Sequence, residues 1–575
     1  MTKVQPRLVR RQIDLVGTWP PEMLPLLRRV YAARGCRDVR SAQPRLADLA
    51  SPSGLSNLTI AVQLLANAIA LQQSILVVGD FDCDGATACA LAVRGLRLLG
   101  AQQVAYAVPH RRVHGYGLSP ALVDELSQYQ PDLLLTVDHG IACHAGVASA
   151  KASGWTVIVT DHHLPGPSLP RADAIVNPNL EGDQFPSKSL AGVGVVFYLL
   201  LALRAHFRQQ SSHCAAGQAD LVTLLDLVAV GTVADLVPLD DNNRILVAAG
   251  IRRIRQGQAC VGLQALIERC GKNAAHLSAS DIGFALAPRL NAAGRLDDMA
   301  LGIDLLVVDE VDHARQIAEQ LEAINAQRKQ MQHTMLGAAT AALAKLADPT
   351  DQKTAGVCFY DPDWHPGVVG LVAAKMSERL YRPVVAIAPS EPGSDLLRGS
   401  ARSIANLHVR DLLAQLQANE PGCMETFGGH AKAAGLSLRL QQLPRFKSAF
   451  AQAAAKTLAS VALDPVIESD GELMQGEFSV QHAQALRFSG PWGQGFPEPL
   501  FDGLFEVVRW RAINATHLSL SLRHPQHGQM LNAIQFHGWL GQPPPAHIHC
   551  AFRLACDDYR GQGAFILIVE HLWPA

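Results

Sequence analysis

The chain has 575 residues, of which 49% are hydrophobic and 17% charged, which excludes a disordered protein, a collagen-like repeat and a small disulfide-rich protein. Because a single hydrophobic core rarely extends beyond about 250–300 residues, we expect at least two domains. The 49 Lys and Arg side chains balance 51 Asp and Glu side chains, and the net charge of −2 gives no overall positive field that would indicate a nucleic-acid partner. A local basic patch could still attract one.

The 11 cysteines include no Cys-x-x-Cys pair, so neither a zinc ribbon nor a thioredoxin motif is expected. Several lie in apolar stretches, which is typical of reduced, buried thiols. The N-terminus lacks the apolar segment of a signal peptide, and the longest uncharged apolar run, 190–203, is shorter than the ~20 residues that span a bilayer. We therefore expect a soluble cytoplasmic protein with no membrane contact.

The first 45 residues form a basic arm with ten Lys and Arg side chains against three acids. Such a segment either contacts phosphates or is a solvated surface, and its composition leaves both possibilities open.

Residues 46–309 are predicted to form an α/β domain. From residue 74, short apolar runs alternate with Ala- and Leu-rich stretches that are typical of helices. Strands are predicted at 74–78, 104–108, 133–137, 156–160 and 174–176. Continuous apolar strands separated by helices indicate a parallel sheet that is covered on both faces.

Acidic residues and histidines directly follow three of these strands. They are Asp80, Asp82 and Asp84; Asp138 and His139; and Asp161, His162 and His163. Ligands of a parallel sheet gather at the carboxyl ends of its strands, so we expect these side chains to meet. If the first loop is extended, its three aspartates point to the same side.

Carboxylates crowded in this way repel one another unless some are protonated or a cation lies among them. Oxygen and imidazole donors without thiolates favour Mn²⁺ or Mg²⁺, and the number of acids favours two ions. For a single residue, the alternative to a metal ligand is a helix cap. A cap explains Asp84 about as well as a metal site does. For Asp235, which ends another apolar stretch, a cap is the better explanation.

The remaining chain divides into three predicted parts. Residues 310–347 read as a long connecting helix that ends at the break Asp348-Pro349-Thr350-Asp351, and 348–462 as a second, smaller α/β domain. Residues 463–575 contain alternating strands at 517–523, 547–555 and 564–572, which is typical of a small all-β barrel. This tail is not notably basic, so we expect modest affinity for nucleic acid from the barrel alone.

The loop with Asp82 and Asp84 and the triplet Asp161-His162-His163 resemble the DHH phosphoesterases. Further segments, in the same order as in the RecJ-type exonucleases of that family, strengthen the resemblance from about residue 45 onward. They are 111–118, 233–239, 287–296, 364–370, 399–403, 428–435 and 491–499. The resemblance implies a DHH domain, a long helix, a DHHA1 domain and an OB fold.

The resemblance also implies roles for individual residues. Two Mn²⁺ or Mg²⁺ ions would be held by Asp80, Asp82, Asp84, Asp138, His162 and Asp235, with Asp138 bridging them. The catalytic set would be Asp82, Asp84, Asp138, Asp161, His162 and His163. Within it, Asp161 would orient an imidazole and His163 would face the phosphate, unless His163 is an ordinary loop histidine. DNA phosphates would be bound by Arg111, Asn291, Arg295, Ser400, Arg402 and His430. Tyr116 would either stack on a base or belong to the core.

The implied activity is processive 5′→3′ hydrolysis of single-stranded DNA to 5′-mononucleotides in recombination and repair, beside a helicase and a single-strand-binding protein. A groove that admits one strand but not a duplex would explain the selectivity. One alternative is a DHH enzyme that acts on oligoribonucleotides or other small phosphates, and a second is a binding protein with an inactive site. The chain departs from the family at His110, His139 and Phe496, and His139 could add an imidazole near the metals.

Overall fold

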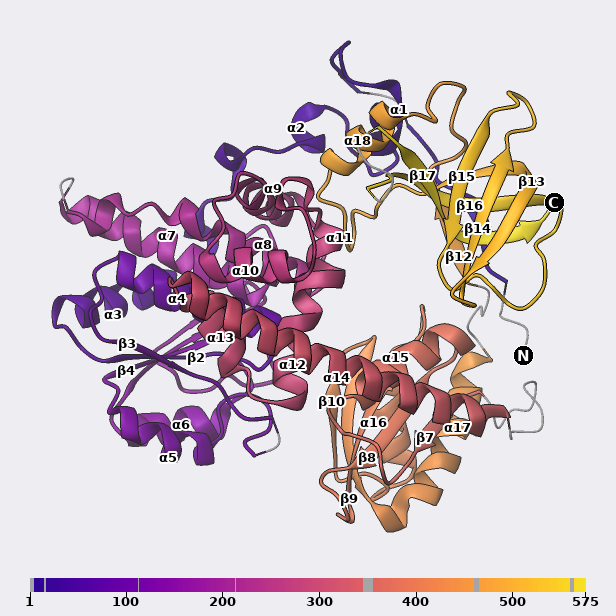
Figure 1. Cartoon of the computed structure of the whole chain (residues 1–575). Coiled ribbons are helices and arrows are strands. Elements are labelled where there is room, and N and C mark those ends of the chain that lie inside the picture. The colour runs from indigo at the N-terminus through magenta and orange to yellow at the C-terminus, as the bar shows by residue number, and fades with distance from the viewer. Residues whose placement is uncertain are drawn as a thin grey trace. The chain divides into compact units, whose positions relative to one another are not determined.

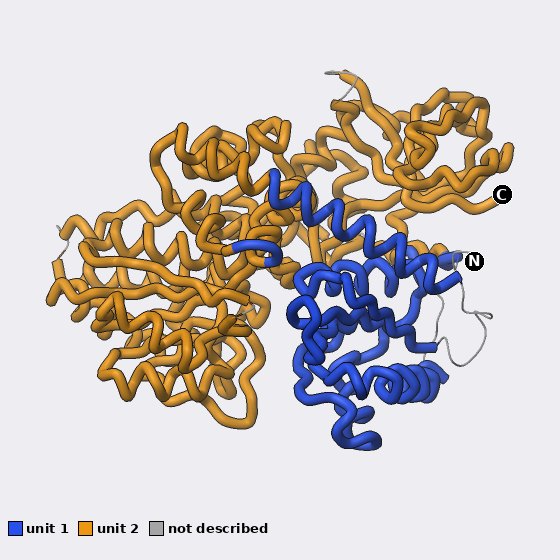
Figure 2. The backbone as a smooth tube through the Cα atoms, turned by 60° about the horizontal axis from the view of Figure 1, so that its bottom comes forward, with its two compact units in different colours: residues 1–7, 295–297, 323–467 blue, residues 8–294, 298–322, 468–575 orange. Residues whose placement is uncertain are grey.

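The computed structural model describes residues 5–14, 17–111, 113–211, 214–344, 355–459, 465–558 and 563–575 (Figure 1). The chain forms two compact units, which Figure 2 shows in different colours. One contains residues 323–467 with 295–297 and the N-terminal residues up to 7, and the other contains 8–294, 298–322 and 468–575. The predicted break at Asp348–Asp351 lies outside the described residues.

Among the described residues, no single helix is both long enough and apolar enough to cross a membrane. One sharply bent pair of helical segments, Leu46–Gly54 with Leu58–Ala70, meets the length and composition criteria together.

The larger unit contains the predicted parallel sheet. Its strands are β2 (Ile75–Val78), β3 (Val104–Ala107), β4 (Leu133–Val137), β5 (Thr156–Thr160) and β6 (Ala174–Val176). They lie in the order β3-β2-β4-β5-β6, and all neighbours are parallel. The prediction from continuous apolar runs is confirmed, and the carboxyl ends of all five strands share one edge.

Helices cover both faces of this sheet, as expected. Alternate strand residues such as Ile75 and Val77 pack against α3 (Leu58–Ala70), α4 (Cys83–Leu98) and α7 (Gly192–Gln210). Their neighbours Leu76 and Val78 pack on the opposite face against α5 (Pro120–Leu126) and α6 (His144–Ala152). Because both faces are buried, the strands carry no polar alternation.

A group of helices follows the sheet in sequence. They are α8 (Leu225–Ala234), α9 (Asp241–Arg255), α10 (Val261–Arg269), α11 (Ala279–Asp281), a π-helical turn (Ile282–Leu286), α12 (Ala287–Leu296) and α13 (Ala300–Val307). Helix α8 packs on α4 and is apolar on all sides because it is buried there. Helix α12 approaches the loop after β2 closely, because Gly294 has no side chain: a Cβ there would lie 1.9 Å from the Phe81 carbonyl oxygen.

The predicted long helix is α14 (Val311–Ala344). Its residues up to 322 belong to the larger unit and those from 323 onward to the smaller unit. The expectation of a single helix that connects two α/β regions is therefore confirmed.

The smaller unit contains a mixed five-stranded sheet in the order β10-β11-β9-β8-β7, in which only β7 and β8 are parallel. The strands are β7 (Val357–Tyr360), β8 (Val384–Pro389), β9 (Leu396–Arg402), β10 (Thr426–Gly429) and β11 (Ala433–Arg439). Helices α14 and α15 (Val369–Leu380) cover one face, and α16 (Val409–Asn419) and α17 (Leu443–Leu458) cover the other.

The C-terminal strands close into a barrel in the order β13-β14-β15-β17-β16, as the sequence predicts. They are β13 (Phe501–Ile513), β14 (His517–Arg523), β15 (Met530–Gln535), β16 (His547–Cys556) and β17 (Phe565–Pro574). Short elements beside the barrel are β1 (Arg7–Arg10), α1 (Pro25–Ala32), α2 (Val39–Ala42), β12 (Val466–Ser469) and α18 (Val480–Phe488). The barrel interior and the core around α4, α7 and α8 belong to one continuous apolar cluster.

The basic N-terminal arm corrects an expectation. Four of its arginines form ion pairs with acids at 468–502 instead of offering their charge to phosphate or solvent. These pairs are Arg10 with Glu472 and Asp502, Arg11 with Glu468 and Asp470, Arg29 with Glu477, and Arg34 with Asp470. The Arg34 side chain is 2% exposed and that of Asp470 is fully buried, so Asp470 neutralises the Arg34 charge in the interior of the protein. Arg37 and Arg45 stay exposed.

Candidate metal centre and phosphate-binding residues

The loop after β2 is not extended over its whole length. Asp82 caps α4, since its Oδ1 accepts a hydrogen bond from the Gly85 N–H at 3.0 Å. Asp84 therefore lies in the first turn of a helix, and the prediction that Asp80, Asp82 and Asp84 share one side of an extended segment is wrong. The capping hydrogen bond starts the helix one residue after Asp82, and it places Asp84 in a different donor group from Asp80 and Asp82.

The described residues contain three groups of donors with ligand atoms within 4.8 Å of one another. They are Asp80, Asp82 and Asp138; Asp84, His162 and Asp235; and Asp138, His162 and His163. His162 Nε2 lies 3.1 Å from Asp138 Oδ1 and 3.5 Å from Asp235 Oδ2. Asp138 adopts a left-handed backbone, with a φ of 64°. The structure thus brings the six proposed ligands to one place at the sheet edge.

The electrostatics of this place fit bound cations. Burial, followed by the charge of Asp82, raises the pKa of Asp80 to about 8 and that of Asp84 to about 7. Burial and neighbouring carboxylates also raise the pKa values of Asp138 and Asp235 well above their ordinary range. Asp80 Oδ1 is buried and has no hydrogen-bond partner among the described residues. Divalent cations would reduce the repulsion between the carboxylates and would give Asp80 Oδ1 a partner.

Asp161 belongs to none of the donor groups found among the described residues, and it holds the two histidines that follow it. Its Oδ1 accepts hydrogen bonds from the His162 N–H at 2.7 Å and the His163 N–H at 3.0 Å, and lies 2.7 Å from His163 Nδ1. Burial would raise the pKa of Asp161, but hydrogen bonding to His163 and its charge hold it below the usual range. Burial would lower the pKa of His163, yet Asp161 raises it to about 9.

Two glycines that the sequence analysis missed shape the centre. Asp84 accepts hydrogen bonds from the Gly192 and Val193 N–H groups, so it does cap a helix, but that helix is α7. A Cβ at Gly192 would lie 2.5 Å from Asp138 Cβ, and one at Gly231 would lie 2.8 Å from Asp84 Oδ1. In the sequence, these glycines could have been recognised as small residues inside the apolar runs 190–203 and 227–234.

Gly192→Ala is therefore expected to displace Asp138 and to lower the rate of the hydrolysis that the resemblance implies by roughly a hundredfold, the cost that an ångström-scale misplacement can have. The matched control is Gly194→Ala on the same helix, where a Cβ meets only the end of the flexible Leu190 side chain at 3.1 Å. Steady-state rates of the two variants test this, and equal rates would contradict it.

Two proposed phosphate contacts lie beside the metal centre. Arg111 Nε donates to the Gly294 carbonyl at 3.0 Å, and its guanidinium lies 3.8 Å from the centre of the Phe81 ring. Asn291 Oδ1 accepts a hydrogen bond from the Cys83 N–H at 2.9 Å, which ties α12 to the loop. Tyr116 is 51% exposed and stands edge-on to Phe81 and His163, so the alternative of a core aromatic is wrong.

Two of the three departures from the family pattern, His139 and Phe496, have defined surroundings in the structure. His139 Nε2 lies 3.1 Å from the Val78 carbonyl, and burial lowers the pKa of His139 to about 4. His139 belongs to none of the donor groups among the described residues, so the expected extra imidazole near the metals is wrong. Phe496 is 5% exposed, and it stacks on Trp492 and lies under the Arg244 guanidinium.

The other proposed phosphate contacts belong to the smaller unit. Arg402 Nη1 donates to Ser400 Oγ at 2.6 Å, and both residues lie on β9. His430 is exposed in the turn between β10 and β11. Arg295 Nη1 donates to the Gly367 carbonyl at 3.5 Å.

Family profiles match three parts of the chain: the N-terminal domain of the DHH family at 74–232, the DHHA1 domain at 352–456 and the RecJ OB domain at 469–571. Proteins named single-stranded-DNA-specific exonuclease RecJ from Salmonella typhimurium and from Escherichia coli are each 45% identical over 577 residues, which is 100% of both chains. That of Thermus thermophilus is 34% identical over 507 residues, covering 87% of this chain and 69% of the relative.

Solved structures agree with this relationship. The crystal structure of Thermus thermophilus RecJ in complex with Mn²⁺ has a TM-score of 0.78 at 30% identity and covers 99% of this chain and 79% of the other. Its complex with Mg²⁺ has a TM-score of 0.74 at 28% identity, covering 99% and 78%. The carboxylate groups described above are suited to the same ions. The chain therefore belongs to the RecJ family, whose members named above are single-stranded-DNA-specific exonucleases.

Proposed function

We propose that the chain is a single-stranded-DNA-specific exonuclease that hydrolyses phosphodiester bonds in the 5′→3′ direction and releases nucleoside 5′-monophosphates, with two Mn²⁺ or Mg²⁺ ions. The observation that carries the proposal is the set of three donor groups at one sheet edge, two of which share Asp138 and two of which share His162. When bound, two such ions lower the pKa of a water and neutralise charge on phosphoryl oxygens.

The proposed ligands are Asp80, Asp82, Asp84, Asp138, His162 and Asp235, with Asp138 between the two sites. Around them, Asp161 keeps the His163 imidazole protonated through its Nδ1. His163 Nε2, which lies 3.4 Å from the Tyr116 hydroxyl, is then a hydrogen-bond donor for a phosphate oxygen. Arg111 and Asn291 bind the neighbouring phosphates.

Ser400, Arg402, His430 and Arg295 are proposed to bind phosphates from the smaller unit. Arg402 supports this best, because it forms no ion pair with any residue that the structure describes, and burial lowers its pKa below the usual range. A Cβ at Gly370, in the first turn of α15, would lie 2.9 Å from Arg402 Nη2. A partly buried guanidinium beside a helix N-terminus is suited to a phosphate.

Arg402→Lys is expected to raise the KM for single-stranded DNA about tenfold with kcat changed less than about twofold, because lysine keeps the charge but loses the planar fork. Arg398→Lys, on the same strand, is the matched control and should leave both constants unchanged. A KM for Arg402→Lys equal to that of the wild type would remove Arg402 from the proposed binding residues.

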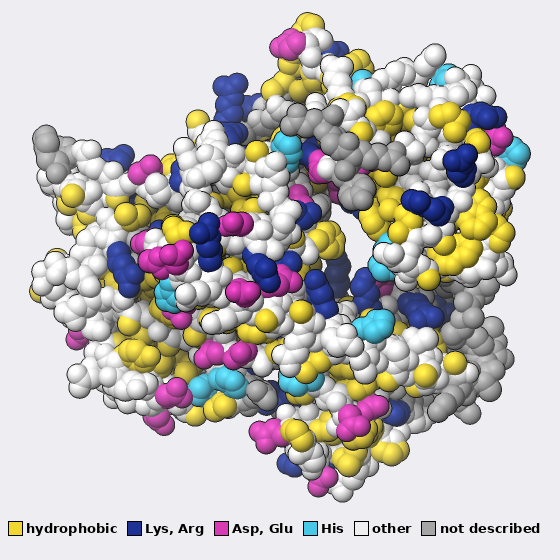
Figure 3. Space-filling model, in the orientation of Figure 1, with side chains coloured by type: hydrophobic (Ala, Val, Ile, Leu, Met, Phe, Trp, Pro, Cys, Tyr) yellow, Lys and Arg dark blue, Asp and Glu magenta, His cyan; other side chains and the backbone are white. Residues whose placement is uncertain are grey.

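The barrel offers features suited to a single strand. Trp510 is 40% exposed and stacks on Trp539 with ring centres 5.3 Å apart. Its neighbours Arg509 and Arg511 are exposed and form no ion pair within the described part of the chain. On the face shown in Figure 3, hydrophobic and basic side chains are mixed over the barrel. Aromatic rings and cations together bind unpaired bases and their phosphates.

A cleavage assay with 5′- and 3′-labelled single strands tests the activity. In Mn²⁺ or Mg²⁺ the 5′ label should appear at once as mononucleotide, while the 3′-labelled strand shortens progressively. Chelator should stop both reactions, and a blunt duplex of the same sequence should persist. Equal rates on duplex and single strand would refute the proposed specificity, and release of the 3′ label first would refute the direction.

We also propose that the enzyme works in DNA recombination and repair in the cytoplasm, on strands opened by a helicase and covered by a single-strand-binding protein. Family membership supports this role. Co-precipitation of the purified chain with each of these proteins in the absence of DNA tests the direct contacts.

A further inference from the structure

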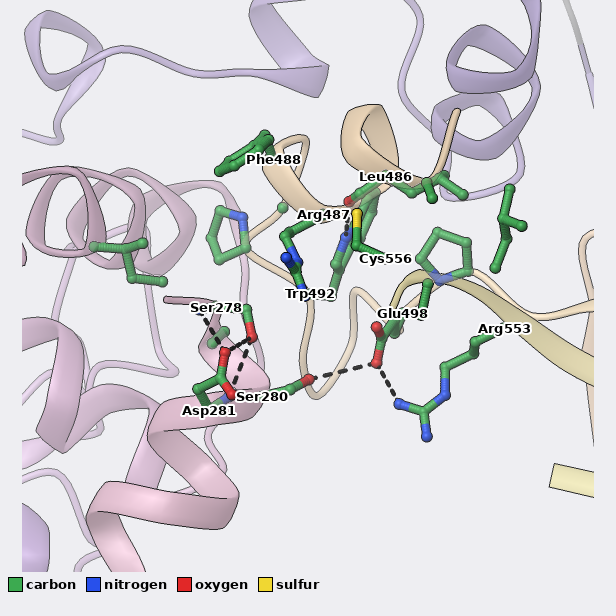
Figure 4. A pocket seen from close by; sticks show the side chains of 18 of the residues that line it. Ser278, Ser280, Asp281, Leu486, Arg487, Phe488, Trp492, Glu498, Arg553 and Cys556 are labelled. Atoms are coloured by element: carbon green, nitrogen blue, oxygen red, sulfur yellow. Dashed lines mark hydrogen bonds and ion pairs between the residues drawn. The ribbon is translucent and has the colours of Figure 1, made fainter. Parts of the chain in front are cut away.

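A cavity of about 330 Å³ lies within the larger unit, away from the metal ligands. Its walls come from α9, α11, α18, the loop at 490–499 and β16 (Figure 4). This volume is at the lower end of the range for pockets that hold small molecules. The cavity therefore has room for one small ligand between the helices and the barrel.

Most charged side chains around the cavity are already paired. Arg487 binds Asp558 through two hydrogen bonds of 2.8 and 2.5 Å. Figure 4 shows Glu498 between Ser280 and Arg553, and Arg553 donates to it at 2.7 Å. Asp281 binds Lys272 at 2.8 Å and also contacts Ser278. These pairs leave little charge for a ligand.

Arg252 and Arg255, which lie three residues apart on the last turn of α9, are different. Neither forms an ion pair with any residue that the structure describes. Arg255 Nε donates to the Leu277 carbonyl at 2.8 Å, which holds the guanidinium in place. Burial and the nearby charge of Arg487 lower the pKa of Arg255 below its usual range. An anion in the cavity would offset this excess of positive charge.

An aromatic ring lies beside Arg255. The Arg255 guanidinium carbon is 4.8 Å from the centre of the Phe488 ring, and Phe488 is 46% exposed. A stacked guanidinium and phenyl ring form a flat platform of the kind on which nucleobases stack. The cavity thus combines two cations that no acid in the described part of the chain neutralises with a surface for a planar group.

We propose that this cavity binds a nucleoside 5′-monophosphate unit, with the phosphate on Arg252 and Arg255 and the base against Phe488. The proposal rests on the nuclease function proposed above, which supplies two sources of that unit: the released mononucleotide and a nucleotide of the DNA strand itself. The segment after Asp235 contacts the 490–499 loop, which lines the cavity, through a 2.6 Å hydrogen bond from the Leu239 N–H to the Gln494 carbonyl.

The test is calorimetric titration of the full chain in EDTA, where cleavage and metal-dependent binding are absent. The ligands are thymidine 5′-monophosphate, inorganic phosphate, thymidine and a ten-residue oligothymidylate. Binding of the monophosphate that is at least tenfold tighter than binding of phosphate or thymidine is expected if the free nucleotide is the ligand. If the strand is the source, the oligonucleotide alone binds through this site.

Arg252→Glu should lower the affinity for the monophosphate, or for the oligonucleotide if the strand is the ligand, by at least tenfold. Phe488→Leu should also lower this affinity, but it should leave the affinity for inorganic phosphate unchanged. Arg253→Ala is the matched control, because Arg253 lies on the same helical turn but contacts Gln258 instead of the cavity. The proposal would be overturned if Arg252→Glu and the wild type had equal affinities for the monophosphate and for the oligonucleotide. It would also be overturned if inorganic phosphate bound as tightly as the monophosphate. Cleavage of labelled strands in Mn²⁺ by the same samples reports separately on the nuclease function.

Discussion

Asp138→Asn is expected to lower the rate of single-strand hydrolysis by at least about a thousandfold, or roughly 4 kcal/mol of activation free energy. Asp138 is the carboxylate common to two of the donor groups, and its Oδ1 lies 3.1 Å from His162 Nε2. Asparagine has nearly the same size and tolerates the left-handed backbone, so the chain geometry at φ 64° should persist. Rates on a 5′-labelled strand at saturating Mn²⁺ measure the loss.

Thermal unfolding separates this effect from misfolding. In EDTA the variant should unfold at the wild-type temperature or slightly above it, because it removes one of several buried carboxylates that repel one another. Mn²⁺ should raise the unfolding temperature of the wild type but not that of the variant, since only the wild type binds the ions tightly. A variant that keeps the wild-type rate, or one stabilised by Mn²⁺ to the same extent, would exclude Asp138 as a ligand.

Arg34→Ala is expected to reduce the free energy of unfolding of the larger unit by about 3–5 kcal/mol, the usual cost of removing one partner of a buried ion pair. Arg34 donates to both oxygens of Asp470, at 2.9 and 3.0 Å, and also to the Pro497 and Val30 carbonyls. Without it, the fully buried Asp470 carboxylate keeps, among the described residues, only Arg11 at 3.4 Å as a charged partner. A lower urea midpoint, followed by far-UV circular dichroism, would show the loss.

Arg37→Ala is the matched control, because Arg37 is exposed on the same arm and should change the midpoint by less than about 0.5 kcal/mol. Arg34→Ala combined with Asp470→Asn should lose less than the sum of the single changes, because the double variant buries no unpaired charge. Equal midpoints for Arg34→Ala and Arg37→Ala would contradict a stabilising role for the buried pair.

Local patterns in the sequence were sufficient for the architecture. The apolar runs at 133–137 and 156–160 became β4 and β5 without a change of bounds, and the helix expected at 310–347 is observed at Val311–Ala344. These elements are long enough, or apolar enough, for their own composition to decide their structure. The position of the acids after the strands was equally informative, because parallel topology brings strand ends to one edge.

Contacts between distant segments decided what the sequence could not. The Asp82 cap moved Asp84 into a helix, where it binds the start of α7, more than a hundred residues away. Arginines of the N-terminal arm form ion pairs with acids at 468–502. His139 contacts the Val78 carbonyl instead of the metal ligands.

Fold class and the kind of metal site could be predicted before any coordinates, because periodicity and strand-end chemistry are local properties of the chain. Which carboxylates meet, and which cations are neutralised, became known only from the packed structure. It also showed that Gly192 must stay small. Each of these outcomes depends on the distance between side chains far apart in sequence, which only the packed chain defines.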